Sequence, residues 1–270
     1  MVVQHNMSAL NANRQLGVTV GTLSKSTEKL SSGYRVNRAA DDAAGLSISE
    51  KMRSQIKGLN KASSNAQDGI SLVQTAEGAL NEAHSILQRM NELATQAAND
   101  TNTGVDREAI QKEINALGSE LNRIASTTQF NTMNLVDGTF ESKSLQVGSL
   151  EGQKIGLSIA TMSGDALSVT SLLVSTFAKS GRAMTKIQSA IDKISTQRSA
   201  LGAVQNRLEH TVKNLDNVAE NTQAAESRIR DTDMAAEMVQ YSATNIIQQA
   251  GQSMLSQANS QTQGVLSLLQ

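Results

Sequence analysis

The chain has 270 residues and a net charge of −1, and it contains no proline, cysteine or tryptophan. The missing cysteines exclude a disulfide framework and a thiolate zinc site, and the interspersed charges include no basic run that would indicate a nucleic-acid surface. Because proline interrupts helices, its absence over this length indicates a protein built mostly from long helices.

The first segment, residues 1–32, has a narrow apolar stripe at helical spacing. Gly17 and Gly21 each cost a helix about 1 kcal/mol relative to alanine, so we expect this segment to fray when it is alone. It lacks the charged start and solid apolar stretch of a secretory signal, and no part of the chain has 18 consecutive apolar residues, so we expect no membrane span. The stripe consists of Leu16, Val20, Leu23, Thr27 and Leu30.

The next stretch, residues 30–58, is LSSGYRVNRAADDAAGLSISEKMRSQIKG, with Gly33, Gly45 and Gly58 as its expected breaks. Two carboxylates side by side are compatible with catalysis, but no histidine or metal-ligand set accompanies them. We interpret them instead as a helix N-terminus stabilised by aspartate, with arginines that cross to a neighbouring segment. The charged residues are Arg35, Arg38, Asp41 and Asp42.

The most regular pattern runs from Leu59 to Ala97. Alternating steps of three and four residues meet twelve positions that are all apolar or glycine, which predicts a helix of about 58 Å with one continuous apolar seam. A second helix must cover such a seam in water. The positions are Leu59, Ala62, Ala66, Gly69, Val73, Ala76, Leu80, Ala83, Leu87, Met90, Ala94 and Ala97.

A shorter helix and a hairpin follow. Thr103 and Asp106 resemble a capping box for the next helix. That helix has an apolar seam of its own and is expected to end near Thr128. Asp137-Gly138 indicates a turn, and alternating apolar residues on both sides of Glu151-Gly152 predict a β-hairpin. The seam is Ile110, Ile114, Leu117, Leu121 and Ile124, and the hairpin residues are Leu145, Val147, Ile155, Leu157 and Ile159.

The partner of the long helix is expected between Ile187 and Ile229. Ten of its thirteen seam positions are apolar, so the chain is expected to go out, turn and return as an antiparallel rod. An ordinary globular helical domain is the alternative, but a compact core has no use for an unbroken seam of 39 residues. The positions are Ile187, Ala190, Ile194, Gln197, Leu201, Val204, Leu208, Thr211, Leu215, Val218, Thr222, Ala225 and Ile229.

The last forty residues repeat the character of the first thirty-two. Their apolar face is rich in small residues that let helix axes approach closely, and it runs to the chain end without a charged tail. We therefore expect the two termini to pair with each other and then with further copies of the chain. The face consists of Ala243, Ile247, Ala250, Met254, Ala258, Val265 and Leu269.

Nothing in the sequence indicates catalysis. His5, His84 and His210 are scattered and lack metal-ligand spacing, and no glycine-rich loop forms a phosphate cradle. No serine lies in a nucleophile elbow. We therefore expect neither an enzyme nor a bound cofactor.

Several motifs together resemble the bacterial flagellins. HNMSALNANR, LSSG, the RVNRAADDAAGL block and QDGISLVQTAEGAL match that family near the amino terminus, and SRIRDTDMAAEMV and NIIQQAGQSMLSQANSQTQGVLSLLQ match it near the carboxy terminus. The resemblance covers roughly residues 1–140 and 180–270. It implies a mainly α fold: a long antiparallel helical bundle or coiled coil with a small β-hairpin region, plus terminal helices that pair as a coiled coil.

The resemblance also implies how the chain is divided. Residues 1–44 and 230–270 would form a terminal coiled-coil domain as the assembly core, residues 45–140 and 180–229 a helical rod domain, and residues 141–179 a β-hairpin with a short variable region. The implied protein is a secreted structural subunit of the extracellular flagellar filament that self-assembles into a helical polymer for motility. Its implied partners are further copies, an export chaperone, the filament cap and hook–filament junction proteins.

A host Toll-like receptor that senses flagellin is a further implied partner. The residues that match the family's receptor patch are Arg89, Leu93 and Glu113, and Arg89 is also spaced to pair with Glu92. A solvated helix face with one partly buried leucine would explain the same residues. The candidates for contacts between subunits are Arg35, Arg38, Asp41, Asp42, Leu16, Val20, Leu23, Ile247, Met254, Val265 and Leu269.

Two other functions are compatible with a long helical hairpin. A hook–filament junction protein shares the terminal signatures but does not polymerise indefinitely. A signalling coiled coil, like the cytoplasmic hairpin of a chemoreceptor, has a similar Ala/Gln/Ser/Glu-rich composition. The absence of a membrane span and the predicted β-hairpin argue against the second alternative.

Overall fold

A computed structural model describes residues 6–267 and divides the chain into two compact units. The terminal unit combines the chain up to Ile56 with the chain from Glu220 onward, and the central unit is Lys57–Ala219. Within the described residues no helix is long and apolar enough to cross a membrane. The finer division into rod and hairpin segments stays a prediction.

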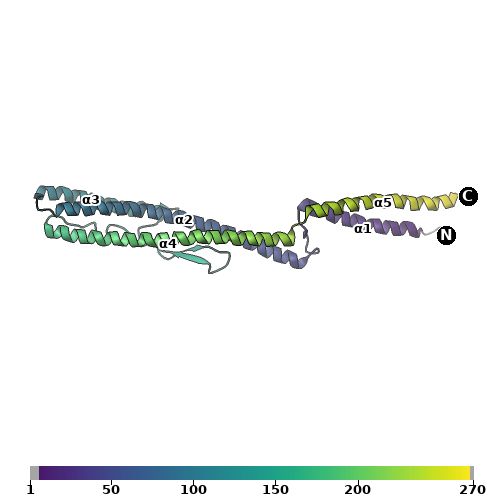
Figure 1. Cartoon of the computed structure of the whole chain (residues 1–270), viewed down its shortest axis with the longest axis horizontal. Helices are drawn as coiled ribbons and strands as arrows, with labels where there is room; N and C mark the ends of the chain where they lie inside the picture. Colours follow the sequence, from purple (N-terminus) through teal and green to yellow (C-terminus); the bar gives the residue numbers. More distant parts are fainter. Residues whose placement is uncertain (1–5, 268–270) are drawn as a thin grey trace. The chain divides into compact units, whose positions relative to one another are not determined.

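In the terminal unit two helices lie side by side (Figure 1): α1 (Met7–Ser32) and α5 (Met234–Ser267). The Asn6 side chain caps α1 by accepting a hydrogen bond from the Ala9 backbone N–H at 3.0 Å. Gly33 ends the helix at φ 75°, a left-handed conformation that glycine adopts without steric cost. The predicted pairing of the two chain ends is therefore present within one subunit.

The two helices pair through half-buried leucines together with small and polar residues. Thr19, Ser26 and Thr244 are buried in the seam, whereas Val20 and Thr27 are exposed. The predicted stripe lies in this seam at Leu16, Leu23 and Leu30, which are half-buried, and leaves it at the two positions between them. The buried or half-buried positions are Ala9, Ala12, Leu16, Thr19, Leu23, Ser26, Glu28, Lys29 and Leu30 on α1, and, among the side chains described on α5, Glu237, Tyr241, Thr244, Asn245, Gln248, Gly251, Leu255 and Ala258.

The apolar face predicted on α5 points mainly away from α1. Ile247 is 56% exposed and Met254 is 65% exposed, and of this face only Ala258 reaches the seam. The side chain of Val265, and Leu269 altogether, lie outside the described residues. The seam positions of α5 are Tyr241, Thr244, Gln248 and Leu255, which lie on another side of the helix from Ile247 and Met254.

Most of α2 (Ala43–Ala97) and α4 (Phe177–Arg230) lies in the central unit, where the two helices run antiparallel and α3 (Gly104–Thr127) returns along part of α2 (Figure 1). All twelve seam positions predicted on α2 are buried. The capping box at the start of α3 is confirmed, with both reciprocal hydrogen bonds between Thr103 and Asp106 present. The mainly α class is therefore confirmed.

The start predicted for the long helix was too late. α2 begins at Ala43, so Gly45 and Gly58 lie inside the helix and do not interrupt it. Gly58 has a packing role instead, because a β-carbon built there would lie 2.8 Å from the Cβ of Ser149 in the hairpin turn. The small residue lets that turn pass close to the helix.

The seam predicted on α4 is buried or half-buried at every position except Val218. Val218 is 37% exposed, and the next residue, Ala219, is 8% exposed and takes its place. An α-helix has 3.6 residues per turn, so a register of 3.5 can miss the buried face by one residue at a single position.

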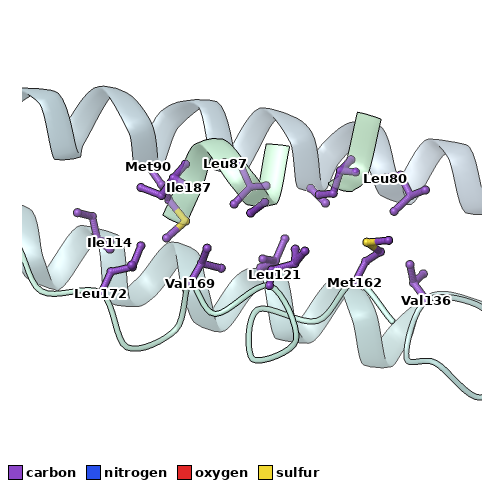
Figure 2. Close-up of a cluster of buried hydrophobic side chains, with 14 of the residues drawn as sticks. Leu80, Leu87, Met90, Ile114, Leu121, Val136, Met162, Val169, Leu172 and Ile187 are labelled. Atoms are coloured by element: carbon purple, nitrogen blue, oxygen red, sulfur yellow. The ribbon is translucent and has the colours of Figure 1, made fainter. Parts of the chain in front are cut away.

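Residues 129–174 form an irregular layer that completes the core. They include β1 (Gln129–Phe130) paired with β2 (Met133–Asn134), and β3 (Lys143–Gln146) paired antiparallel with β4 (Lys154–Leu157). The predicted hairpin is thus confirmed, although Val147 and Ile159 lie beyond its strands. Figure 2 shows side chains from this layer and from α3 pointing toward α2; the labelled ones are Val136, Met162, Val169 and Leu172 from the layer and Ile114 and Leu121 from α3.

Candidate functional site

The charged turn between α1 and α2 is a capping structure. Asp42 accepts a hydrogen bond from the Gly45 backbone N–H at 2.8 Å and so caps the first turn of α2. Asp41 accepts from the backbone N–H groups of Arg38 and Asn37, and the Arg38 hydrogen bond is the main reason why the pKa of this carboxyl is lowered. The interpretation of the aspartates as structural residues is confirmed for the cap at Asp42.

The arginines of this turn bind other segments of the terminal unit. The Arg38 guanidinium lies 2.9 Å from a carboxylate oxygen of Glu28, and Arg35 donates to the backbone carbonyl of Ile229. The backbone N–H of Arg35 also donates to the carbonyl of Arg230 at 2.6 Å. These contacts join the turn that precedes α2 to α1 and to the end of α4 within one subunit.

A second polar cluster in the terminal unit could not be found from sequence spacing. Arg230 lies 2.7 Å from Glu50 and stacks over the Tyr34 ring at 4.6 Å, and Ser49 donates to Glu226 at 2.9 Å. The hydrogen bond from Arg230 is the main reason why the pKa of Glu50 is lowered. The partners are about 180 residues apart in the chain, and neither sequence block alone indicates the pairing.

Large apolar side chains remain exposed on both terminal helices. On α1, Val18 is 60% exposed and Val20 is 42% exposed; on α5, Val239 is 71% exposed and Ile246 is 67% exposed. Isolated exposed apolar residues are ordinary, but this number on one helix pair indicates a surface for another macromolecule. The exposed set is Met7, Leu10, Val18 and Val20 on α1, and Met234, Met238, Val239, Ile246, Ile247 and Met254 on α5.

The candidate receptor patch lies on α2 and α3 in the central unit. Arg89 donates to Glu113 at 2.9 Å and 3.1 Å and to Glu92 at 3.2 Å; the Glu113 hydrogen bond is the main reason why the pKa of Arg89 is raised. Arg89 and Glu113 are exposed, whereas Leu93 is only 2% exposed. A direct contact by the Leu93 side chain is therefore not available from solvent, and this residue supports the patch from below.

The described residues hold no group of three or more histidine, cysteine, aspartate or glutamate side chains that could bind a metal ion. His84 and His210 lie on different helices, and His5 lies outside the described residues. The helices of the molecule expose faces with apolar and charged side chains. They define a class of coiled-coil protein suited to binding other macromolecules.

Comparison with known proteins identifies the family. The model for the bacterial flagellin N-terminal helical region matches residues 3–141, and the model for the C-terminal helical region matches residues 184–269. The chain belongs to the bacterial flagellin family. As such it is a structural subunit of the flagellar filament, a homopolymer outside the cell, and is not an enzyme.

Individual relatives agree with this assignment over the whole chain. A flagellin of Halalkalibacterium halodurans is 54% identical, and a flagellar filament 31.3 kDa core protein of Treponema maltophilum is 49% identical; each match covers 100% of both chains. The crystal structure of Bacillus cereus flagellin is similar to this one with a TM-score of 0.52 and 33% identity, over 60% of this chain and 94% of that chain.

Proposed function

We propose that this flagellin polymerises through the outward apolar faces of its paired terminal helices. The observation that carries this proposal is the arrangement of the terminal unit: α1 and α5 pair through half-buried leucines and buried hydroxyl residues, and they expose residues such as Val20, Ile247 and Met254. Burial of such side chains is favourable by about 1.5–3 kcal/mol each. Neighbouring subunits supply that burial.

The geometry of growth follows from the use of unlike surfaces. A contact between two different faces of identical copies continues indefinitely when the rotation between copies does not close, and this generates a helical polymer. Leu16 and Leu23 hold the seam within a subunit, whereas the outward residues join subunits. Arg35, Arg38, Asp41 and Asp42 shape the turn that joins the two helices α1 and α2.

Polymerisation of point variants tests this assignment. We expect Ile247→Ser and Met254→Ser each to raise the critical concentration for growth on filament seeds by about tenfold, since each removes apolar burial between subunits. Sedimentation after seeding measures that concentration. Ser256→Ala, an exposed change on the same helix, is the matched control. Unchanged growth of both serine variants with normal helix content would refute the role of this face.

The exposed face of α5 also supports an export partner. We infer that an export chaperone covers this face before assembly and that the chain is secreted unfolded, then added beneath the filament cap next to the hook–filament junction proteins. The support is physical, because a face with Val239 and Ile246 exposed requires cover at high concentration. Co-purification of the chaperone with Ile246→Ser and with Ser256→Ala tests this step, and equal recovery would contradict it.

We further propose that the host Toll-like receptor for flagellin binds the Arg89–Glu113 patch of the free subunit. Both side chains are exposed and already held in one arrangement, so binding them requires little further ordering. We expect Arg89→Ala to lower receptor signalling by at least tenfold. Arg53→Ala, another exposed arginine on α2 that pairs with a glutamate three residues away, is the control. An unchanged response to Arg89→Ala would remove the assignment.

A further inference from the structure

The helices of the central unit carry opposite charge. Residues 62–97 of α2 together with α3 contain eight acidic and four basic side chains, whereas residues 177–207 of α4 contain six basic and one acidic. Among the described residues a single ion pair, Glu77 to Arg198 at 3.7 Å, joins the two sets within the subunit. Five of the eight acidic residues form ion pairs within the subunit, whereas five of the six basic residues on α4 form none with the described residues.

A groove of about 520 Å³ lies on the acidic side, between α2 and α3. Its apolar lining includes Ala79, Ile86 and Ile124, all half-buried, and its lining also holds Glu120 and Arg123, which form an ion pair with each other. Glu82 lines the same groove and makes no hydrogen bond or ion pair with any residue that the structure describes. A concave surface with an apolar base and an unpaired carboxylate suits a helix face that carries positive charge.

Gly78 in this groove has no packing role within the subunit. It lies in the interior of α2, where glycine costs about 1 kcal/mol relative to alanine, and a β-carbon built on it would meet no heavy atom within 4 Å. Gly58 and Gly69 on the same helix each face a close neighbour, so this glycine differs from them. The open space above Gly78 leaves room for a close approach from outside the subunit.

A matching surface lies on α4. Four cations spaced by three, four and seven residues share one face of the helix, and each is exposed. None has a carboxylate within ion-pair distance among the described residues. This basic stripe spans about 21 Å of helix, and the α2 side of the groove, Gln74 to Ile86, spans about 18 Å. The basic stripe consists of Lys179, Arg182, Lys186 and Lys193.

We propose that the basic stripe of one subunit docks into the α2/α3 groove of a second copy and forms a lateral contact of the polymer. Charge complementarity, the similar lengths of the two surfaces and the open space over Gly78 support a second copy as the occupant. Leu173, 56% exposed beside the first three cations, supplies apolar surface for the groove. The contact joins unlike surfaces, so it propagates as a filament requires. This inference rests on the proposed polymerisation and names a further interface for it.

Charge reversal with rescue tests the contact on the full chain. Glu82→Lys and Lys186→Glu each place like charges together, so we expect each to raise the critical concentration at least tenfold at low salt. The double variant exchanges the charges and is expected to return to within about threefold of the original value. Helix content and Tm of each monomer establish that the variants fold. Single variants that polymerise normally, or a double variant that is no better than the singles, would overturn the proposal.

Cross-linking locates the contact independently. Filaments grown from equal amounts of ¹⁴N and ¹⁵N chains are treated with a carbodiimide, which joins carboxylates to amines in direct contact. We expect Glu82 to be joined to Lys179, Lys186 or Lys193 in mixed-label peptides from filaments and not from monomers. Mixed-label peptides that never contain Glu82 would refute this interface while leaving polymerisation intact. If the original chain forms no filament, the proposed function itself fails.

Discussion

Replacing Gly78 by alanine is expected to stabilise the free subunit. The residue lies inside α2, where the change removes the helix cost of glycine, about 0.5–1 kcal/mol. The added methyl group has no heavy atom within 4 Å to collide with, so nothing in the subunit offsets the gain. A gain of 1 kcal/mol corresponds to a rise in Tm of about 2–4 °C for a domain of this size.

The same substitution nine residues earlier provides the matched control. A β-carbon on Gly69 would lie 2.5 Å from a terminal methyl carbon of Leu145 and 3.4 Å from one of Leu208. Overpacking of this kind costs about 1–3 kcal/mol, which exceeds the helix gain. We therefore expect Gly69→Ala to be less stable than the original chain by about 1 kcal/mol, although it is the same chemical change in the same helix.

Thermal unfolding of the monomeric chain, followed by far-ultraviolet circular dichroism, measures both effects. The reasoning would be refuted if Gly78→Ala lowered Tm, or if the two variants shifted it equally. Seeded growth adds a second measurement: Gly78→Ala is expected to raise the critical concentration while raising Tm, because its methyl group stands where the second copy approaches. Stability and assembly would then change in opposite directions.

Three further outcomes follow from the contacts described. Arg230 lowers the pKa of Glu50 from its ordinary value of 4.5. The contribution of this carboxylate to stability is therefore present above pH 4.5 and is lost as the pH falls through the folded-state pKa. Glu50→Gln should flatten the acid limb of a curve of Tm against pH. Asp42→Ala removes the cap on Gly45 and should cost about 1 kcal/mol in a urea titration, with Asp42→Asn close to the original. Leu87→Ala, at a fully buried position, should cost about 2–5 kcal/mol in the same titration, and a loss below 1 kcal/mol would contradict the assigned core.

The central helices could be predicted because their burial follows from local spacing. Each seam position on α2 meets the same kind of environment, another helix at close range, so a strict 3.5-residue repeat identifies the buried face. The repeat fails on α4 at Val218, where nothing in the sequence indicates that Ala219 is the buried residue. The irregular layer is harder still, because the burial of Val169 and Leu172 depends on contacts with distant helices. Gln111 fixes that layer by bonding the backbone of Leu172 and Val174.

The terminal helices show where hydrophobic patterning is ambiguous. The apolar pattern includes Val20, Ile247 and Met254, which are exposed in the single chain, because such a pattern cannot distinguish burial within a subunit from burial between subunits. Thr19 and Ser26 are buried against the partner helix because their small side chains fit where the two helices pack together. The Glu50–Arg230 pair escaped prediction for another reason: its members are brought together by the whole fold.

Two polar contacts near the ends of the seam between α1 and α5 help to set its alignment. The Asn6 amide donates to the carbonyl of Ala258 at 2.9 Å, and Lys29 lies 3.4 Å from Glu237. Thr19 and Thr244 donate their hydroxyl hydrogen bonds to carbonyls of their own helices, so these two hydroxyls do not fix the alignment in the middle of the seam. When the chain refolds, α1 and α5 can shift along each other until both polar contacts form. The correct alignment of the two helices is then recovered without a template.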